Sequence, residues 1–465
     1  METFGVVVIG AGPGGYPAAI RAAQLGASVA LVEKESLGGT CLNWGCIPTK
    51  ALIHAAGVFA QMRSAASLGL KVGKTSFDYA AMVERKDQVV RTLRNGVKQL
   101  LAGNGVKVME GTASFESRNR IVVNSKAGKI LIGAGKTIIA TGTTSSMPDF
   151  LPRHGRVVDS RAFLELKSVP ARVIVLGGGI IGCEFACLLA RLGVQVAVVE
   201  ILEDILAVLD ADVRRELRRH MEKTLGIRIY TGQGLENIAA EGNTVRGTVA
   251  GDTLEADLLL AALGRKPVTK ELQIEKAGLR VNAQGCIEAD EYGRTQVATI
   301  YAVGDVTGGP QLAHVATSQG LVAAENACTR HLRRNETCFP YCIFTSPEVG
   351  AAGLTEQEAG QKGLEIKTGR FNFAALGKGQ AIDDHPAGFV KWIADPETGQ
   401  LLGAQAVGAH ATELIAEATT AIRAELTVTD VARTIHAHPT LAEAWMESAH
   451  VLLGEAIHAV ARRAR

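Results

Sequence analysis

An internal repeat constrains this chain more than any other feature of its sequence. The motif GxGxxG occurs twice, and its glycines are Gly10, Gly12 and Gly15 in the first copy and Gly177, Gly179 and Gly182 in the second. Each copy follows a β-branched apolar segment and precedes an Ala-rich one. An acid, Glu33 or Glu200, stands 18 residues after the last glycine in both copies. This order predicts two βαβ units of the type that binds dinucleotides.

The residue types of the repeat suit pyrophosphate recognition. Glycines let the backbone approach a pyrophosphate, which then lies at the positive N-terminal end of the following helix. The carboxylate accepts hydrogen bonds from a ribose hydroxyl. The alternative is that the glycines serve only tight turns and packing. One copy would leave that alternative open, whereas two matched copies favour two bound dinucleotides.

Length and charge exclude several classes of protein. A chain of 465 residues should contain about three domains rather than one binding module. Lys and Arg number 49 and Asp and Glu number 47, without a block of like charges, so we do not expect nucleic acid as a partner. No apolar run is long enough to predict a membrane span. The sequence starts without a leader pattern, and its eight cysteines are too few for a disulfide scaffold, so we expect a cytoplasmic protein.

Local composition marks the expected domain boundaries. TIIATGTTSSMP (137–148) and LLLAALGRKP (258–267) each predict a buried strand that ends in a turn-forming stretch. TIYAVGDV (299–306) predicts a strand, and an apolar helix follows it. Beyond Pro340, segments such as GFVKWIA and LLGAQAVGA predict an antiparallel sheet with helices. The predicted fold is α/β, with two Rossmann-like dinucleotide-binding domains and a C-terminal α+β domain, and its predicted segments are 1–145 and 271–339 for the first domain, 146–270 for the second and 340–465 for the third.

Cys41 and Cys46 stand in GGTCLNWGCIPTK (38–50), at the start of the helix expected after the first acid. In a regular helix their Cα atoms would lie roughly 8 to 9 Å apart, beyond the limit of about 7 Å for a disulfide. A bridge therefore requires a distorted first turn, which Gly45 and Pro48 can supply. The helix N-terminus also lowers the pKa of a thiol. Alternatively, both cysteines are small buried hydrophobic residues.

A second candidate pair, His438 and Glu443, lies in HAHPTLAE (436–443) with Pro439 between its members. A carboxylate that orients a His ring and stabilises its imidazolium form makes a general acid–base pair. His436 would point the opposite way on an extended segment, and we interpret it as structural.

These motifs resemble those of a known family. GGTCLNWGCIPTK is similar to the redox-active disulfide segment of the flavin-dependent pyridine nucleotide-disulfide oxidoreductases, and HAHPTLAE is similar to their C-terminal acid–base segment. TIYAVGDV resembles the segment that contacts the flavin ribityl chain. LAH (312–314) resembles a stretch common in the dihydrolipoamide dehydrogenase branch, to which the chain is most similar. The resemblance covers essentially the whole chain.

The resemblance implies FAD in the first dinucleotide-binding domain, NAD in the second and a homodimer formed through the C-terminal domain. The implied reaction is oxidation of protein-bound dihydrolipoamide to lipoamide with reduction of NAD⁺ to NADH, through a redox-active Cys41–Cys46 disulfide. The implied partner is a lipoyl-bearing carrier protein of a 2-oxo acid dehydrogenase or glycine cleavage complex. His438, oriented by Glu443, would face Cys41 of the other subunit.

The resemblance also implies roles for single residues. Cys46 would be the charge-transfer thiol against the flavin, and Cys41 the interchange thiol that meets the dithiol. Lys50 would lie near the flavin N5 with Glu184 as its partner, and Asp305 would accept from a ribityl hydroxyl. No metal ligands are implied. The full set expected to contact the cofactors is Gly10, Gly12, Gly14, Gly15, Glu33, Lys50, Thr141, Gly142, Asp305, Gly177, Gly179, Gly182, Glu200 and Gly264.

Some of these residues have ordinary alternatives. Glu184 could be a solvated carboxylate at a helix start, stabilised by the helix dipole, and Asp305 an ordinary turn residue after Gly304. The chain departs from the family at Trp44, which stands between the cysteines in place of a small or branched aliphatic residue. Packing and substrate entry at the disulfide can therefore differ from those of relatives.

Other functions compete with the leading one. Residues 455–465 contain no paired cysteines, which disfavours mercuric reductase. Glu200 and Gly182 disfavour glutathione reductase, because NADPH-using relatives usually carry basic residues after the second strand and Ala at the third glycine. Soluble transhydrogenases generally lack the complete cysteine pair. A flavin-bearing structural subunit would have no physical need for the Cys–Cys–Lys and His–Glu sets.

Overall fold

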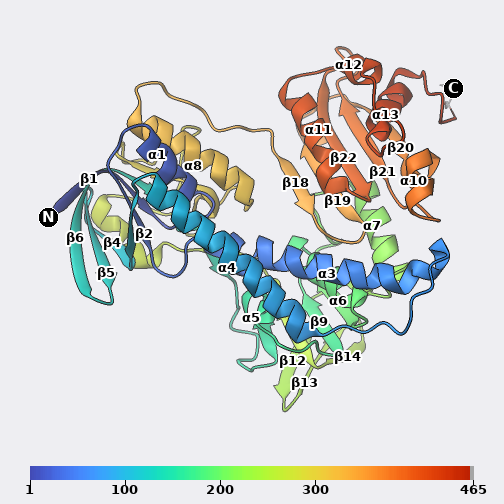
Figure 1. Cartoon of the computed structure of the whole chain (residues 1–465), viewed down its shortest axis with the longest axis horizontal. Coiled ribbons are helices and arrows are strands. Elements are labelled where there is room, and N and C mark those ends of the chain that lie inside the picture. The colour runs from blue at the N-terminus through green and yellow to red at the C-terminus, as the bar shows by residue number, and fades with distance from the viewer. Residues whose placement is uncertain (461–465) are drawn as a thin grey trace.

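Three main sheets organise the chain in the computed structural model, which describes residues 1–460 (Figure 1). Two contain the parallel strands that the repeat predicts, and the third is the antiparallel sheet expected beyond Pro340. The predicted α/β class with two Rossmann-like units and a C-terminal α+β unit is confirmed. The last five residues of the predicted third domain, 461–465, lie outside the described part. No helix within the described part is long and apolar enough to cross a membrane.

The first sheet contains the first repeat. Its elements are β1 (Glu2–Ile9), α1 (Gly15–Gln24), β2 (Val29–Glu33), β3 (Lys107–Glu110), β4 (Thr112–Ser117), β5 (Arg120–Ser125), β6 (Gly128–Ile139) and β17 (Ile300–Ala302). The strand order is β3-β2-β1-β6-β5-β4, and β17 also pairs with β6 in parallel. β1, β2, β3 and β6 are parallel, whereas β4 and β5 form an antiparallel extension. Residues around 300 therefore return to the first sheet after the second unit.

Helices surround this first unit and carry the redox segment. These are α2 (Gly39–Trp44), α3 (Cys46–Ser64), α4 (Tyr79–Gly103), the short 3₁₀ helix η4 (Gly304–Thr307) and α8 (Ala313–Cys328). In Figure 1, α3 leaves the first unit and runs between the second and third units. The apolar helix predicted after TIYAVGDV is α8.

The second unit repeats the arrangement of the first. Its elements are β8 (Val157–Asp159), α5 (Ser160–Leu164), β9 (Arg172–Leu176), α6 (Ile180–Arg191), β10 (Gln195–Glu200), α7 (Ala211–Lys223), β11 (Arg228–Thr231), β12 (Glu236–Glu241), β13 (Thr244–Val249), β14 (Asp252–Ala256) and β15 (Leu258–Ala261). The parallel order is β11-β10-β9-β15-β8, and β12 to β14 form a separate antiparallel sheet. An antiparallel pair, β7 (Thr143–Ser145) with β16 (Arg265–Pro267), joins the points where the chain enters and leaves the unit.

The third unit is an antiparallel sheet flanked by helices. Its elements are β18 (Pro340–Ile343), β19 (Glu348–Gly353), α9 (Glu356–Gln361), β20 (Lys367–Asn372), α10 (Gly377–Ile382), β21 (Phe389–Ala394), β22 (Leu401–Gly408), α11 (Ala411–Arg423), α12 (Val428–Arg433) and α13 (Glu443–Leu453). The strand order is β18-β19-β22-β21-β20. GFVKWIA and LLGAQAVGA contain the paired strands β21 and β22, as predicted.

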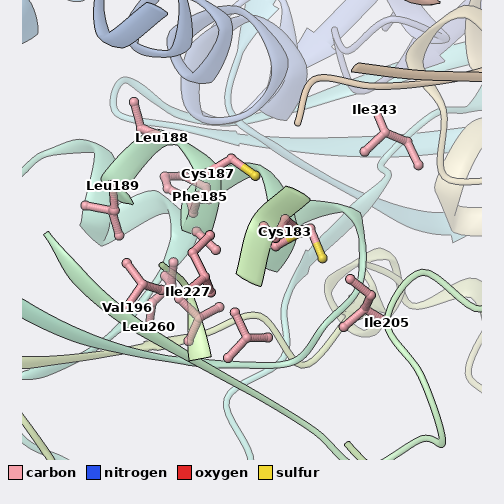
Figure 2. Packing of buried hydrophobic residues seen from close by; sticks show 14 of the residues in the cluster. Cys183, Phe185, Cys187, Leu188, Leu189, Val196, Ile205, Ile227, Leu260 and Ile343 are labelled. Atoms are coloured by element: carbon pink, nitrogen blue, oxygen red, sulfur yellow. The ribbon is translucent and has the colours of Figure 1, made fainter. Parts of the chain in front are cut away.

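A buried apolar cluster joins the three units. It contains Leu52 from α3, much of α6, and Ile343 and Val349 from the third sheet. Figure 2 shows the side chains of α6 packed inside this cluster, with Ile343 nearby. Burial of each large apolar side chain contributes about 1.5–3 kcal/mol, so the cluster fixes α3, α6 and β18 relative to one another.

Cys183 and Cys187 belong to this cluster and not to a reactive site. Both are buried, and burial raises the pKa of each thiol, that of Cys187 to about 12. A neutral, buried thiol is a poor nucleophile. This agrees with the expectation that the chemistry resides at another pair of cysteines.

The first and second glycines of each repeat differ in what surrounds them. Gly177 has a φ of +109°, and a Cβ there would lie 2.4 Å from the carbonyl oxygen of Ala262. Gly10 has the same contact with Ala140, also at 2.4 Å. By contrast, a Cβ on Gly179 would meet nothing within 4 Å, and one on Gly12 only a Cα at 3.9 Å. The protein's own packing requires the first glycine, and the second leaves space for a ligand.

Gly177→Ala is therefore expected to destabilise the second unit, because it combines positive φ with a backbone clash. We expect a loss of about 2–4 kcal/mol and a clear fall in the apparent Tm by differential scanning fluorimetry. Gly179→Ala is the matched control and should cost at most about 1 kcal/mol as a weaker N-cap. Equal Tm values for the two variants would contradict this account of the turn.

Candidate functional site

The redox segment folds as two helices with a break between the cysteines. Cys41 lies in α2, Cys46 begins α3, and Gly45 between them has φ −138° and ψ −110°, outside the helical region. A Cβ on Gly45 would lie 3.0 Å from the carbonyl oxygen of Thr40, so the break suits glycine. The helix is thus interrupted at the place where a Cys41–Cys46 bridge requires it. Both cysteines are free, half-buried thiols in this structure.

The pKa values of the two thiols are shifted in opposite directions. Hydrogen bonding with Cys41, together with the charge of Lys50, lowers the pKa of Cys46 to about 7 against the effect of burial. The same hydrogen bond and burial raise the pKa of Cys41 well above its usual range. Cys46 also begins a helix, where a thiolate is favoured. Cys46 is therefore the member of the pair that carries negative charge near neutral pH.

A buried amide, Asn43, holds the redox turn in place. Its Nδ2 donates to the carbonyl oxygens of Leu37 and Gly39, at 3.0 and 2.9 Å. Its Oδ1 accepts from Arg94 Nε of α4 at 2.9 Å. Sequence reasoning did not identify Asn43 or Arg94, because Arg94 is 51 positions away and no local pattern links them.

Trp44, which departs from the family pattern, contacts the second unit. The guanidinium of Arg161 in α5 lies 3.9 Å from the centre of its ring. Arg161 Nη2 also donates to Glu35 Oε1 at 2.7 Å. The redox turn is therefore tied to the second unit through Trp44.

Lys50 and Glu184 form a close ion pair. Lys50 Nζ lies 2.9 and 2.8 Å from the two carboxylate oxygens of Glu184. Glu184 is only 4% exposed, so the alternative of a solvated helix-start carboxylate is wrong. Its Oε1 also accepts from the backbone N–H of Phe344 at 3.0 Å, and the Phe344 ring lies 4.6 Å from Lys50 Nζ. Sequence reasoning missed Phe344.

Asp305 is held by the strand pair that joins the first two units. Its Oδ2 accepts from Thr143 Oγ1 at 2.9 Å, and Thr143 in turn accepts from Arg265 Nε at 2.7 Å. Arg265 also donates to the carbonyl oxygen of Thr143, and burial lowers the pKa of its guanidinium. Thr141 donates to the carbonyl oxygen of Val268 at 2.7 Å. Arg265 stands beside Gly264 in the sequence but was not predicted as a site residue.

The acids of the two repeats make the same contacts. Each carboxylate accepts from the residue that follows the first glycine and from the residue two positions after itself. The contacts are Ala11 N and Glu35 N on Glu33, both at 2.7 Å, and Gly178 N and Leu202 N on Glu200, at 2.6 and 2.8 Å. A carboxylate has about four lone-pair sites, so each acid retains capacity for a ribose hydroxyl.

The residues present fit a dinucleotide in each unit. A surface hollow beside the first repeat is lined by residues that include Gly10, Glu33 and Thr141. The second glycines leave open space beside the N-termini of α1 and α6, where a pyrophosphate would be stabilised. Gly14 lies at the start of α1, against Val303 and Ala316. Gly142 and Gly264, with φ of +64° and +88°, lie directly before the two strands of the pair between the units.

His438 and Glu443 pair as the sequence indicates. His438 Nδ1 and Glu443 Oε1 are 2.9 Å apart, and Glu443 Oε2 accepts from Thr440 N at 2.8 Å. These hydrogen bonds lower the pKa of Glu443 although burial opposes them. The His438 side chain is 74% exposed. Within residues 1–460, no hydrogen bond or ion pair connects this pair to the cysteines or to Lys50.

His436 has a different environment. Its Nε2 lies 2.7 Å from Glu417 Oε1, and its Nδ1 lies 3.0 Å from the carbonyl oxygen of Thr434. The hydrogen bond to Glu417 raises the pKa of His436. Its side chain is only 6% exposed, which supports the structural interpretation.

Three carboxylates between the second and third units have the spacing of metal ligands. They belong to Asp210, Asp212 and Glu356. Lys391 Nζ lies 2.6 to 2.8 Å from all three, and its side chain is 2% exposed. The ammonium supplies the positive charge that this cluster requires, and we assign no metal to it.

Comparisons with known proteins agree with this geometry. The sequence pattern of the pyridine nucleotide-disulphide oxidoreductases matches residues 4–320, and that of the dimerisation domain of the same proteins matches residues 339–449. Dihydrolipoyl dehydrogenase of Chlamydia muridarum is 42% identical over 460 residues, with 98% of each chain covered. The enzyme of the same name from Haloferax volcanii is 43% identical over 467 residues, again with 98% of each chain covered.

A solved structure has the same fold over nearly the whole chain. The HOCl-induced flavoprotein disulfide reductase of Escherichia coli superposes with a TM-score of 0.86 at 30% identity, covering 96% of this chain and 99% of the other.

Replacing Cys41 tests the origin of the acidity of Cys46. Cys41→Ala removes the hydrogen bond to the Cys46 thiolate, so the pKa of Cys46 should rise above about 7. Alkylation of Cys46 by iodoacetamide, followed by peptide mass spectrometry, should then be about tenfold slower at pH 6 than in Cys41→Ser, which keeps a hydroxyl donor. The same pH profile in both variants would show that Cys41 does not stabilise the thiolate.

Proposed function

The chain belongs to the pyridine nucleotide-disulphide oxidoreductase family, and on this premise we propose that it catalyses the dihydrolipoyl dehydrogenase reaction. It oxidises dihydrolipoamide to lipoamide and reduces NAD⁺ to NADH, with FAD as the bound cofactor. The observation that carries the proposal is the break at Gly45, which sets an acidic Cys46 thiol beside Cys41 and the Lys50 charge. When bound, FAD supplies a two-electron carrier between the dithiol and NAD⁺.

Cys41 and Cys46 divide the exchange step between them. A thiolate of dihydrolipoamide attacks the Cys41 sulfur of the disulfide, the Cys41–Cys46 bond breaks, and Cys46 leaves as a thiolate. The second substrate thiolate then attacks the substrate sulfur bound to Cys41, which releases lipoamide and the Cys41 thiolate. The thiol of lower pKa is the better leaving group, and Cys46 is that thiol. Lys50 stabilises the charge that Cys46 acquires.

His438 supplies the acid–base function. Glu443 fixes its Nδ1, so that Nε2 is directed away from its own carboxylate partner. An exposed His with an orienting carboxylate suits a site completed by a second chain. In this proposal the protein is a homodimer, and His438 takes the substrate protons beside the partner subunit's Cys41.

The physiological partner in this proposal is a lipoyl-bearing carrier protein of a 2-oxo acid dehydrogenase or glycine cleavage complex. The proposed location is the cytoplasm, where a reducing environment keeps other thiols free. Eight cysteines in 465 residues are too few for a disulfide scaffold, which supports this location.

Substrate and cofactor preference test the proposed reaction. The kcat/KM of the purified yellow protein should be at least tenfold higher for dihydrolipoamide with NAD⁺ than for other dithiols, glutathione or NADP⁺. Glu200 accepts from a ribose hydroxyl but repels a 2′-phosphate of like charge. A higher kcat/KM with glutathione than with dihydrolipoamide would contradict the proposed substrate. Equal values with NAD⁺ and NADP⁺ would contradict the role of Glu200.

Mixed dimers test the shared site. Cys41→Ser chains and His438→Ala chains should each be inactive alone, because each lacks one part of every site. After subunit exchange, half of the dimers are mixed and each holds one complete site, so activity should recover to about a quarter of the wild-type value. If no activity returns although exchange is demonstrated by mass spectrometry, His438 acts within its own chain.

A further inference from the structure

Phe344 lies where the elements that carry the redox chemistry meet. It directly follows β18 of the third unit. Its backbone N–H donates to Glu184 Oε1 at 3.0 Å, and its ring centre lies 4.6 Å from Lys50 Nζ. A single residue of the third unit therefore contacts both members of the ion pair, one from α3 and one from α6.

The contacts of Phe344 restrict where the Lys50 ammonium can lie. Lysine has a flexible four-carbon stem, so the stem alone does not fix where the Lys50 ammonium lies. Glu184, 5% exposed at its side chain, binds the ammonium through both oxygens. The negative face of an aromatic ring attracts a cation, with about 0.5–1 kcal/mol at exposed sites and about 2 kcal/mol when desolvated. The Phe344 ring, in addition to the Glu184 carboxylate, thus attracts the Lys50 ammonium.

The position of Lys50 matters because its charge acts on Cys46. The charged and titratable groups around this thiol are Cys41 of α2, Lys50 of α3, Glu184 of α6 and Arg265 of β16. Lys50 lowers the pKa of Cys46, and Glu184 raises it. Coulomb interactions weaken with distance, so an ammonium that moves towards solvent stabilises the thiolate less.

We propose that Phe344 is a positioning residue, whose ring holds the Lys50 ammonium against Glu184, within range of the Cys46 sulfur. The third unit thereby influences a thiol that belongs to the first. The inference rests on the proposed function, because that function gives Cys46 its role. The pKa of Cys46 can be measured whether or not the proposed reaction occurs. Sequence analysis identified the ion pair through family resemblance and gave no role to Phe344.

The test measures the acidity of Cys46 in the FAD-bound protein carrying Cys41→Ser, so that one thiol of the pair remains. The rate of Cys46 alkylation by iodoacetamide is followed against pH by peptide mass spectrometry. Phe344→Leu should raise the pKa of Cys46 and slow alkylation about two- to fivefold at a pH below the midpoint. Phe344→Tyr keeps a ring and should retain the parent profile.

Two controls separate positioning from a general effect on folding. Phe339→Leu removes another ring, five positions earlier in the chain, that packs on Tyr341 with centroids 5.7 Å apart, and it should leave the profile unchanged. In a background of Lys50→Met with Glu184→Gln, which leaves no uncompensated buried carboxylate, Phe344→Leu should have no further effect on Cys46.

The outcomes decide the proposal whatever the substrate is. An unchanged profile in Phe344→Leu, with an unchanged Tm, would overturn it. An equal shift in the background without the ion pair would also overturn it, because Phe344 would then act on Cys46 by another route. A failure of dihydrolipoamide as substrate would contradict the proposed function and leave this result standing.

Discussion

The ion pair between Lys50 and Glu184 is the interaction on which the arrangement of the site depends. Transfer of a carboxylate from water into a protein is costly unless a charge and hydrogen bonds compensate it. Lys50 Nζ and Phe344 N supply both, from the first and the third unit, to a carboxylate of the second. The apolar cluster around α6 packs these elements together, and the ion pair selects the arrangement in which their polar groups meet. The Cys46 thiol begins the helix that carries Lys50, so its environment is set by all three units.

The two repeats have the same loop geometry, although each is expected to bind a different dinucleotide. In each, the first glycine allows the turn, the second leaves space, and the acid holds the loop through two backbone N–H groups. An acid that is already fixed by the loop presents its remaining lone pairs in a defined direction, which reduces the ordering cost of binding. The same geometry thus accounts for both the stability of the loop and the expected recognition of a ribose.

Features that depend on local sequence could be predicted. The repeat predicted the parallel strands of both dinucleotide-binding units, and the segment HAHPTLAE predicted the pairing of His438 with Glu443. The spacing of Cys41 and Cys46 showed that a bridge between them would require a distorted helix turn, and left open that both are buried apolar residues. Contacts between distant residues could not be predicted in this way. Phe344 lies 160 positions from Glu184, and Lys391 occurs in a strand-like segment where a solvent-facing side chain would be ordinary, yet it is buried among three carboxylates. The spacing of residues along the sequence does not predict such contacts, because they form only when distant segments pack together. The domain boundaries and the cofactor contacts of single residues stay predictions.

The central claim is that Cys46 carries the thiolate against the flavin and Cys41 meets the substrate. The most direct test is the long-wavelength absorption of the FAD-bound protein, since a thiolate in contact with oxidised flavin donates charge to it. Cys41→Ser should show this band without added reductant, and the band should disappear on acidification through the pKa of Cys46. Cys46→Ser should lack it at every pH. A band in Cys46→Ser and none in Cys41→Ser would reverse the two roles and contradict the account.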